Sequence, residues 1–324
     1  MKRMLKLGAI AVLAGGITVL AAPVAPALAA DDYPSKVVRC VVPFGAGGGT
    51  DRWARIMSSV GFDFFKSGMR VQNRGGADGT VGWKYMLDKG ADGHTILLAS
   101  PTPIIAALLE KKPPFDPSKV KIAAYYSVMK PTLMAPKGKP YSSWEGLVKY
   151  LKGSGRKLTI GGTIAQTLGP ASILNQLGLI DRVILVTYSG TGKTVNDFLG
   201  GHIDLATVTT STATTLTNKA VAILNSTDID YPKKAARVLG KVPNARTLGL
   251  KPFTPPRFIA MHPDTPDAEV AIMSKKLGEM LSSKPVKDLI GKLNEDIFFL
   301  DRDKAAKAYA EAVNDSKKYL PLFK

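Results

Sequence analysis

The chain has 324 residues, of which 45% are hydrophobic, and its formal net charge is +18 at pH 7. This length predicts a globular protein that divides into two domains. A single cysteine, Cys40, excludes an internal disulfide and lies among valines, so we expect a small buried hydrophobe in a strand. The positive charge fits anionic partners, but Lys and Arg are scattered without interleaved aromatics, so no nucleic-acid partner is expected.

Residues 1–30 have the three parts of a secretory signal peptide. Basic residues occupy the first positions, an apolar run covers 7–20, and Ala27 and Ala29 supply the small-x-small cleavage pattern. A transmembrane anchor is the alternative, but it needs about 20 uninterrupted apolar residues and two prolines break this stretch. We therefore expect an exported protein, cleaved near Ala29 or Ala30.

Short apolar strands alternate with helical segments in the next part of the chain, which is the pattern of helices flanking a mainly parallel sheet. Strands are predicted at 36–43, 69–73 and 94–100, and helices at 51–65 and 81–88.

A crossing strand at 131–136 begins a second α/β unit. The helix that follows it opens with a capping-box pattern, from Ser142 to Glu145. The further strands of this unit are predicted at 158–161, 183–187, 202–208 and 220–224, and its further helices at 166–177 and 193–199.

The tail after Ser226 is rich in proline and holds one strand candidate, 257–262, before three helical segments at 267–282, 286–293 and 301–318. Because these helices lack strands of their own, we expect the tail to pack on the first unit. Residues 31–128 plus 229–324 then form a discontinuous first lobe, and 129–228 form the second. Two crossings between α/β lobes make a hinge and an interlobe cleft at the strand ends.

A glycine-rich loop joins the first predicted strand to its helix; its residues are Phe44, Gly45, Ala46, Gly47, Gly48, Gly49, Thr50 and Asp51. Glycines let backbone N–H groups approach an anion, and the helix adds its positive N-terminal end. Thr50 or Asp51 is also a candidate N-cap. A dinucleotide fingerprint has different spacing and an acidic residue after the second strand, so anion capture is favoured, with a plain tight turn as the alternative.

A second loop resembles the end of a phosphate-binding P-loop; it runs Tyr188, Ser189, Gly190, Thr191, Gly192, Lys193, Thr194. Thr187 stands where the P-loop has its first glycine, and no aspartate suited to magnesium follows a partner strand, which disfavours a nucleoside triphosphatase. Two interpretations stay open. The loop offers amides, hydroxyls and the Lys193 ammonium to a carboxylate, or it is a solvated turn.

Two further strand ends place polar side chains toward the predicted cleft, Ser100 and Thr102 in the first lobe and Thr163 and Gln166 in the second. Helix capping and ligand orientation explain them equally well. The three histidines are far apart and lack metal-ligand or nucleophile motifs. We therefore expect no catalytic residue, no metal, no cofactor and no enzyme activity, and an exported hydrolase would have to show turnover.

Several motifs resemble the Bug/TctC receptors of tripartite tricarboxylate transporters over the whole mature chain. The matching runs are Tyr33-Pro34-Ser35-Lys36, Val41 to Phe44 with Gly47 to Asp51, Asn73 to Gly79 with Gly82, Ala91 to Thr95, Tyr188-Ser189-Gly190 and Asp197 to Asp204. The resemblance implies a type II periplasmic binding-protein fold whose lobes close on a ligand. It also implies that the loops at 44–51 and 188–192 hold a ligand carboxylate, partly through ordered water.

This resemblance predicts a monomeric periplasmic receptor that captures a small organic carboxylate for a membrane permease. A ligand-dependent co-receptor for a membrane sensor protein is the alternative, and the neighbouring gene would distinguish the two. The chain departs from the family pattern at 163–166 and near 208–210, and it has an unusual threonine-rich run at 207–217. Thr209 is expected at the ligand site, and these departures leave the ligand unnamed.

Overall fold

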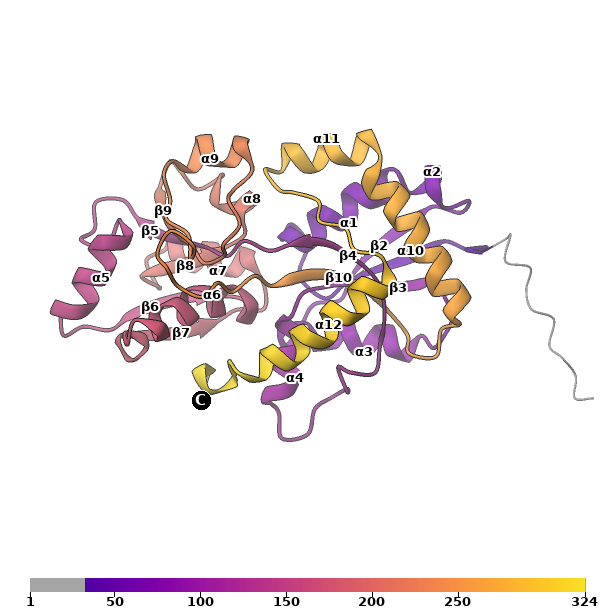
Figure 1. Ribbon diagram of the computed structural model, residues 1–324, viewed down its shortest axis with the longest axis horizontal. Coiled ribbons are helices and arrows are strands. Elements are labelled where there is room, and N and C mark those ends of the chain that lie inside the picture. Colours follow the sequence, from indigo (N-terminus) through magenta and orange to yellow (C-terminus); the bar gives the residue numbers. More distant parts are fainter. Residues whose placement is uncertain (1–32, 324) are drawn as a thin grey trace, which may run out of the picture.

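Two five-stranded sheets, each covered by helices, divide the protein into two lobes (Figure 1). The computed structural model describes residues 33–323, so the predicted signal peptide and its cleavage site lie outside the described residues. The predicted α/β class with two lobes is confirmed. Among the described residues, no helix is both long and apolar enough to cross a bilayer.

The first sheet has the strand order β2-β1-β3-β10-β4. β2 and β3 pair parallel with β1, whereas β10, which comes from late in the chain, is antiparallel to both β3 and β4. The bounds are β1 Val38–Val42, β2 Met69–Asn73, β3 Thr95–Ala99, β4 Lys121–Val128 and β10 Pro256–Met261. Helices cover both faces of this sheet, which explains why its central strands are continuous apolar runs.

The helices of the first lobe form two layers. One face of the sheet packs on α1 Gly49–Ser59, α10 Asp267–Ser282 and α11 Lys284–Lys292, and the other on α3 Thr80–Asp88, α4 Thr102–Leu109 and α12 Arg302–Lys317. The short elements are α2 Gly61–Phe64, η2 Ala77–Gly79 and η4 Leu320–Phe323. The single helix expected at 51–65 is two helices, broken beside Gly61, where a Cβ would lie 2.7 Å from the Met69 nitrogen.

The second sheet repeats this arrangement with the order β7-β6-β8-β5-β9. β7 and β8 pair parallel with β6, and β5 is antiparallel to β8 and β9. The strands are β5 Thr132–Pro136, β6 Leu158–Gly162, β7 Val183–Thr187, β8 Leu205–Val208 and β9 Ala220–Asn225. The helices are α5 Trp144–Gly153, α6 Ile164–Gln176, η3 Ile180–Arg182, α7 Thr191–Leu199, α8 Thr210–Ala213 and α9 Lys233–Leu239.

The start of α5 differs from the predicted capping box. The N-cap is Ser143, whose Oγ accepts a hydrogen bond from the Gly146 N–H at 3.0 Å. The Ser142 hydroxyl instead donates to the Pro136 carbonyl oxygen at 2.6 Å. Because the residue three positions after Ser143 is a glycine, no acidic side chain completes the box.

Two chain crossings run side by side between the lobes. At the crossing into β5, Met129 donates its backbone N–H to the Pro255 carbonyl at 2.8 Å, and Ser226 donates to Pro131 at 3.2 Å. The segment 229–250, expected on the first lobe, packs on the second. Asn244 bridges to Asn225 of β9, and Ala245 is buried in the core of the second sheet.

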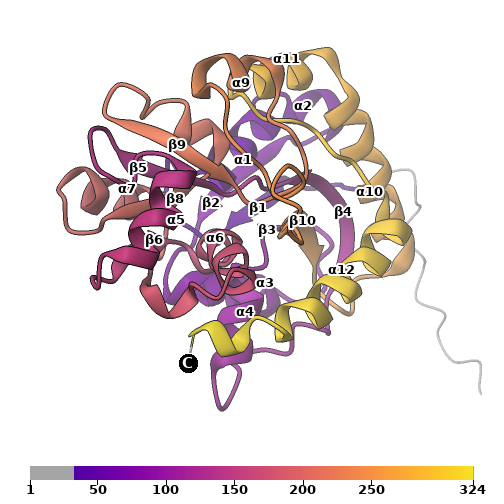
Figure 2. The same cartoon turned by 60° about the vertical axis from the view of Figure 1, so that its left-hand side comes forward.

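Direct contacts also join the lobes beyond the crossings. α4 of the first lobe and α6 of the second lie next to each other (Figure 2). The Thr102 Oγ1 at the start of α4 accepts a hydrogen bond from the Ala165 N–H of α6 at 3.1 Å. On another side of the interface, Asn294 donates to the Thr214 hydroxyl at 3.3 Å.

Candidate functional site

A cavity of about 190 Å³ lies between the lobes, where the carboxyl ends of their parallel strands face each other. The first lobe contributes the loop after β1, the end of β3, the crossing residue Met129 and the start of β10. The second lobe contributes the loops after β6, β7 and β8. The lining residues are Phe44, Gly45, Ala46, Gly48, Gly49, Thr50, Ser100, Met129 and Arg257 from the first lobe and its crossing, with Thr163, Gln166, Ser189, Gly190, Thr191, Gly192, Lys193 and Thr209 from the second.

Besides the four-residue α8, three longer helices begin at this cavity. The N-cap residues of α1, α6 and α7 are Gly48, Thr163 and Gly190, and all three line it. The first N–H groups of a helix have no partner inside the helix, and the helix dipole makes this end positive. The cavity therefore has three helix N-termini from two lobes around it, an arrangement that favours an anion.

The glycine-rich loop is held in shape by Asp51. Its carboxylate accepts hydrogen bonds from the Gly47 N–H at 2.8 Å and from the Asn73 and Arg55 side chains at 2.9 Å each. Burial alone would raise the pKa of Asp51, but these three donors outweigh it and lower the pKa. Asp51 and Gly47 do not line the cavity, and neither Thr50 nor Asp51 is the N-cap, because Gly48 takes that place.

Most residues of the loop before α7 line the cavity, but its first residue points elsewhere. Ser189 through Lys193 line the cavity, whereas Tyr188 does not. The Tyr188 hydroxyl donates to the Asp197 carboxylate at 2.7 Å. Burial, and then this hydrogen bond, raise the pKa of Tyr188 to about 12. Tyr188 therefore fixes the loop to α7 rather than facing the cavity.

Of the other polar residues predicted at the site, four line the cavity and one does not. Ser100, Thr163, Gln166 and Thr209 line the cavity, and Thr102 instead makes the interlobe hydrogen bond to Ala165. Gln166 accepts the Thr163 N–H at 3.1 Å and donates to the Thr191 hydroxyl at 3.0 Å. This side chain is thus a helix-capping group that also ties the start of α6 to the start of α7.

Arg257 and Glu295 form a buried ion pair beside the cavity, with side chains 1% and 6% exposed. Glu295 also accepts hydrogen bonds from the Trp53 indole at 2.9 Å and from the Ser211 hydroxyl of the second lobe at 2.7 Å. Burial would raise the pKa of Glu295, but the Arg257 charge and these donors lower it. Lys193 and Arg257 are the charged side chains among the lining residues that the structure describes, and no carboxylate is among them.

Comparison with known proteins identifies the family. The family model described as "TctC: Tripartite tricarboxylate transporter family receptor" matches residues 66–320. The chain belongs to the TctC family. This confirms the resemblance seen in the sequence motifs. Members of the TctC family are periplasmic substrate-binding receptors, not enzymes.

Individual proteins of known sequence or structure are similar to this chain over most of its length. The chain is 29% identical over 287 residues to "Protein BugT" of Bordetella pertussis, which covers 84% of each protein. Among solved structures, MatC of Rhodopseudomonas palustris with bound malate is 21% identical, with a TM-score of 0.75 over 89% of this chain and 100% of that one. R. palustris Rpa4515 with adipate is 18% identical, with a TM-score of 0.79 over 90% of this chain and 98% of that one. These structures support the type II fold.

Sequence analysis missed Arg257, Glu295 and Met129 in this TctC receptor. Arg257 is the one charged residue of β10 and follows a proline-rich crossing, so a charge inside a buried strand was the available signal. Glu295 carried no comparable signal, because its partners lie 38, 84 and 242 positions away in the sequence.

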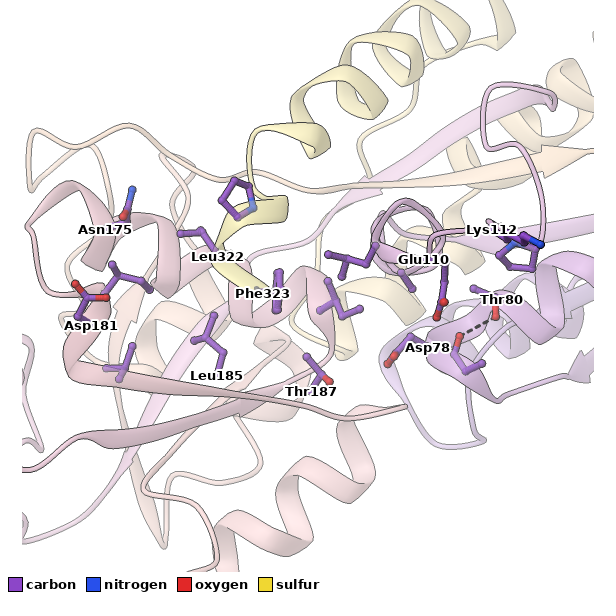
Figure 3. Close-up of a pocket in the computed structure, with 18 of the residues that line it drawn as sticks. Asp78, Thr80, Glu110, Lys112, Asn175, Asp181, Leu185, Thr187, Leu322 and Phe323 are labelled. Carbon is purple, nitrogen blue, oxygen red and sulfur yellow. Dashed lines mark hydrogen bonds between the residues drawn. The ribbon is translucent and has the colours of Figure 1, made fainter.

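A larger pocket of about 1060 Å³ lies elsewhere between the lobes, beside the C-terminal end. Figure 3 shows Leu322 and Phe323 of η4 above Leu185 of the second lobe, with Asp78 of the first lobe farther to the right. Its charged lining residues carry both signs and are half-buried or exposed: Asp78, Glu110, Lys112, Lys157 and Asp181. Without a uniform charge or a buried cation, this pocket is a weaker anion site than the smaller cavity. Within residues 33–323, no group of three His, Cys, Asp or Glu side chains is arranged for a metal ion.

Proposed function

We propose that the protein is an extracytoplasmic receptor that captures a small organic carboxylate for the membrane permease of a tripartite tricarboxylate-type transporter. The observation that carries this proposal is the set of three helix N-termini and two cationic side chains around a cavity lined by no described carboxylate. The malate in MatC and the adipate in Rpa4515 support the same ligand class. The signal peptide predicted at 1–30 supports delivery to the periplasm.

The ligand contacts belong to the lining residues of the cavity. Backbone N–H groups at the starts of α1 and α7 bind the carboxylate, and Ser100, Thr163 and Thr209 orient the rest of the ligand. Gly47, Asp51, Thr102 and Tyr188 support this set without touching the ligand, since each lies outside the lining. The protein works as a monomer in this proposal.

Binding and lobe closure are the same event in this mechanism. The hinge lies where the two crossings run together, at 129–131 and 251–255. Residues 33–128 with 256–323 then move as one lobe, and 132–250 move as the other. A ligand that bonds helix N-termini of both lobes has its full set of contacts only when they are closed. It therefore shifts the population toward the closed form.

A thermal-shift screen tests the proposal with acetate, malate, adipate, citrate and benzoate. At least one acid is expected to raise the melting temperature of the wild-type protein in proportion to the logarithm of its concentration. Gly48→Asp should abolish this increase, because it places a negative charge at the start of α1. Gly48 has no left-handed backbone, and its nearest contact for a Cβ is 3.5 Å, so the protein should still fold.

The control is Asn314→Asp, which adds the same charge on the exposed surface of α12 and should leave ligand stabilisation unchanged. Stabilisation by no acid of the panel, or equal stabilisation of the wild type and Gly48→Asp, would overturn the proposal.

A further inference from the structure

One nitrogen of the Arg257 guanidinium is hydrogen-bonded to Glu295, and another buried nitrogen has no hydrogen-bond partner. Its Nη1 donates to the Glu295 carboxylate, while its Nε has no hydrogen-bond partner among residues 33–323 although it is fully buried. In the planar guanidinium, Nε and Nη2 lie on the same edge, which is the edge that takes a carboxylate with two parallel hydrogen bonds.

This edge lies where the two lobes meet. A Cβ on Gly49 would be 3.3 Å from the Arg257 Nη2 and 3.2 Å from the Thr209 methyl group. Gly49 begins α1 in the first lobe, Thr209 follows β8 in the second, and both line the cavity together with Arg257. The Nη2 end of this edge thus lies beside the start of α1, and Arg257 is one of the residues that line the cavity.

A purely structural ion pair does not account for this geometry. A buried donor without a partner destabilises a protein, because it has lost its hydrogen bonds to water and gained no acceptor in exchange. The same Nε–H becomes favourable once an anion accepts it. The Glu295 carboxylate, which accepts from Trp53 and Ser211 as well, fixes the orientation of the guanidinium and leaves the side-on edge for a guest.

We propose that Arg257 is a ligand-anchoring residue, whose Nε and Nη2 bind one carboxylate of the ligand directly and so select acids over their neutral amides. This rests on the proposed carboxylate-receptor function and deepens it, because it adds a side-chain ion pair to recognition by backbone amides. Glu295 is the positioning residue for Arg257. Since Ser211 belongs to the second lobe, the positioning of Glu295 is completed only when the lobes are together.

The test compares acids with their amides by calorimetry. The probes are malate, adipate and benzoate, each paired with malamide, adipamide or benzamide. Truncating Arg257 alone would strand a buried carboxylate, which is strongly destabilising, so the main variant is the double substitution Arg257→Gln with Glu295→Gln. Its affinity for the best acid should fall by about 10- to 100-fold, as expected for lost charge-assisted hydrogen bonds. Its affinity for the matching amide should change by less than about three-fold, so that the preference for the acid shrinks.

A second variant, Arg257→Lys, keeps the positive charge but removes the side-on edge, and it should also lose about 10-fold in affinity for the acid. The matched control is Arg246→Gln with Asp230→Asn, which neutralises an exposed ion pair of the second lobe and should leave all affinities unchanged. Circular dichroism establishes that each variant is folded.

The outcomes separate the two proposals. Binding of no acid to the wild-type protein removes the receptor function and this inference with it. Binding of an acid to the wild type and to both Arg257 variants within about two-fold overturns only the role of Arg257. If the double variant does not fold, Arg257→Lys decides alone, by the same criterion.

Discussion

Gly49 is the residue at which the start of α1, the side chain of Thr209 and the guanidinium of Arg257 meet. The missing Cβ makes room for this three-way contact, because a methyl group there would be closer to both neighbours than most real contacts. The glycine therefore serves the approach of the two lobes. Its backbone is ordinary helical backbone, since it begins α1.

We predict that Gly49→Ala weakens binding of any stabilising acid from the screen, because the added methyl group pushes Thr209 or Arg257 away. Overpacking of this kind costs roughly 1–3 kcal/mol. Gly291→Ala is the control, since a Cβ there meets no atom within 4 Å in α11 and should stabilise the fold by up to about 1 kcal/mol. Urea unfolding and a ligand titration of both variants measure the two effects. Unchanged ligand affinity of Gly49→Ala would show that Thr209 and Arg257 can accommodate the added methyl group without disturbing the ligand site.

Because the pKa of Asp51 is lowered in the folded protein, stability decreases as the pH falls through the acidic range. A carboxyl group whose folded-state pKa lies below its unfolded value of about 3.9 contributes stability above that value. The contribution is lost as the pH falls through the folded-state pKa. We predict that the free energy of unfolding decreases below about pH 4, and that Asp51→Asn makes this decrease shallower while costing about 1–3 kcal/mol at pH 7 through weakened hydrogen bonds. Urea titrations between pH 3 and 7 measure both. An Asp51→Asn curve parallel to wild type would contradict the assignment.

At the scale of elements, α6 has its cap completed by the other lobe. The Gln166 side chain accepts the N–H of the N-cap residue Thr163, and the Ala165 N–H donates to the Thr102 hydroxyl of α4. Thr102 is fully buried, so this amide has no access to water when the lobes are together. The start of α6, which faces the cavity, is therefore ordered by contact with the first lobe.

Thr102→Val is expected to destabilise the closed form, because it leaves a buried N–H without an acceptor at a cost of about 1–3 kcal/mol. Thr102→Ser keeps the hydroxyl and should bind ligand nearly as the wild type does. Calorimetric titration of both variants with the stabilising acid gives the comparison. Equal affinities for the two variants would mean that the Ala165 N–H finds another partner.

Elements with clear apolar periodicity or a glycine boundary could be predicted from the sequence. β2, β7 and α10 have the bounds expected for them, and the loops before α1 and α7 were found because they are rich in glycine. β4 was missed because it is buried along nearly its whole length, so it shows no alternation. The ion pair of Arg257 and Glu295 could not be found, because only the fold brings β10 and the residues after α11 together.

The two sheets of the molecule have the same arrangement of strands. In each sheet, the fourth strand in the order is formed by chain that has just crossed from the other lobe. β5 is inserted beside β8 after the chain first crosses, and β10 is inserted beside β3 after it returns. Each lobe is thus completed by a strand that leads directly into the hinge. We therefore expect bending at the crossings, where backbone hydrogen bonds such as that from Met129 to Pro255 hold the two segments together.

Small-angle X-ray scattering should detect closure as a decrease in the radius of gyration when the stabilising acid is added to the wild-type protein. Gly48→Asp should show no decrease at the same concentration, and Asn314→Asp should behave as the wild type. The physical reason is that the ligand bridges helix N-termini of both lobes, so that only the closed form makes all contacts. An unchanged radius with saturating ligand would rule out lobe closure on binding.

The final turn of the chain has a practical consequence for how the protein is handled. α12 runs from the first lobe toward the second and delivers η4 against α4 (Figure 1). Leu320, Leu322 and Phe323 join an apolar cluster that contains Ile105 of one lobe and Ile164 of the other. An affinity tag or fluorescent fusion appended there would lie beside this contact between the two lobes and is expected to disturb it. Reporters of opening and closing are therefore better carried by exposed positions such as those along α5.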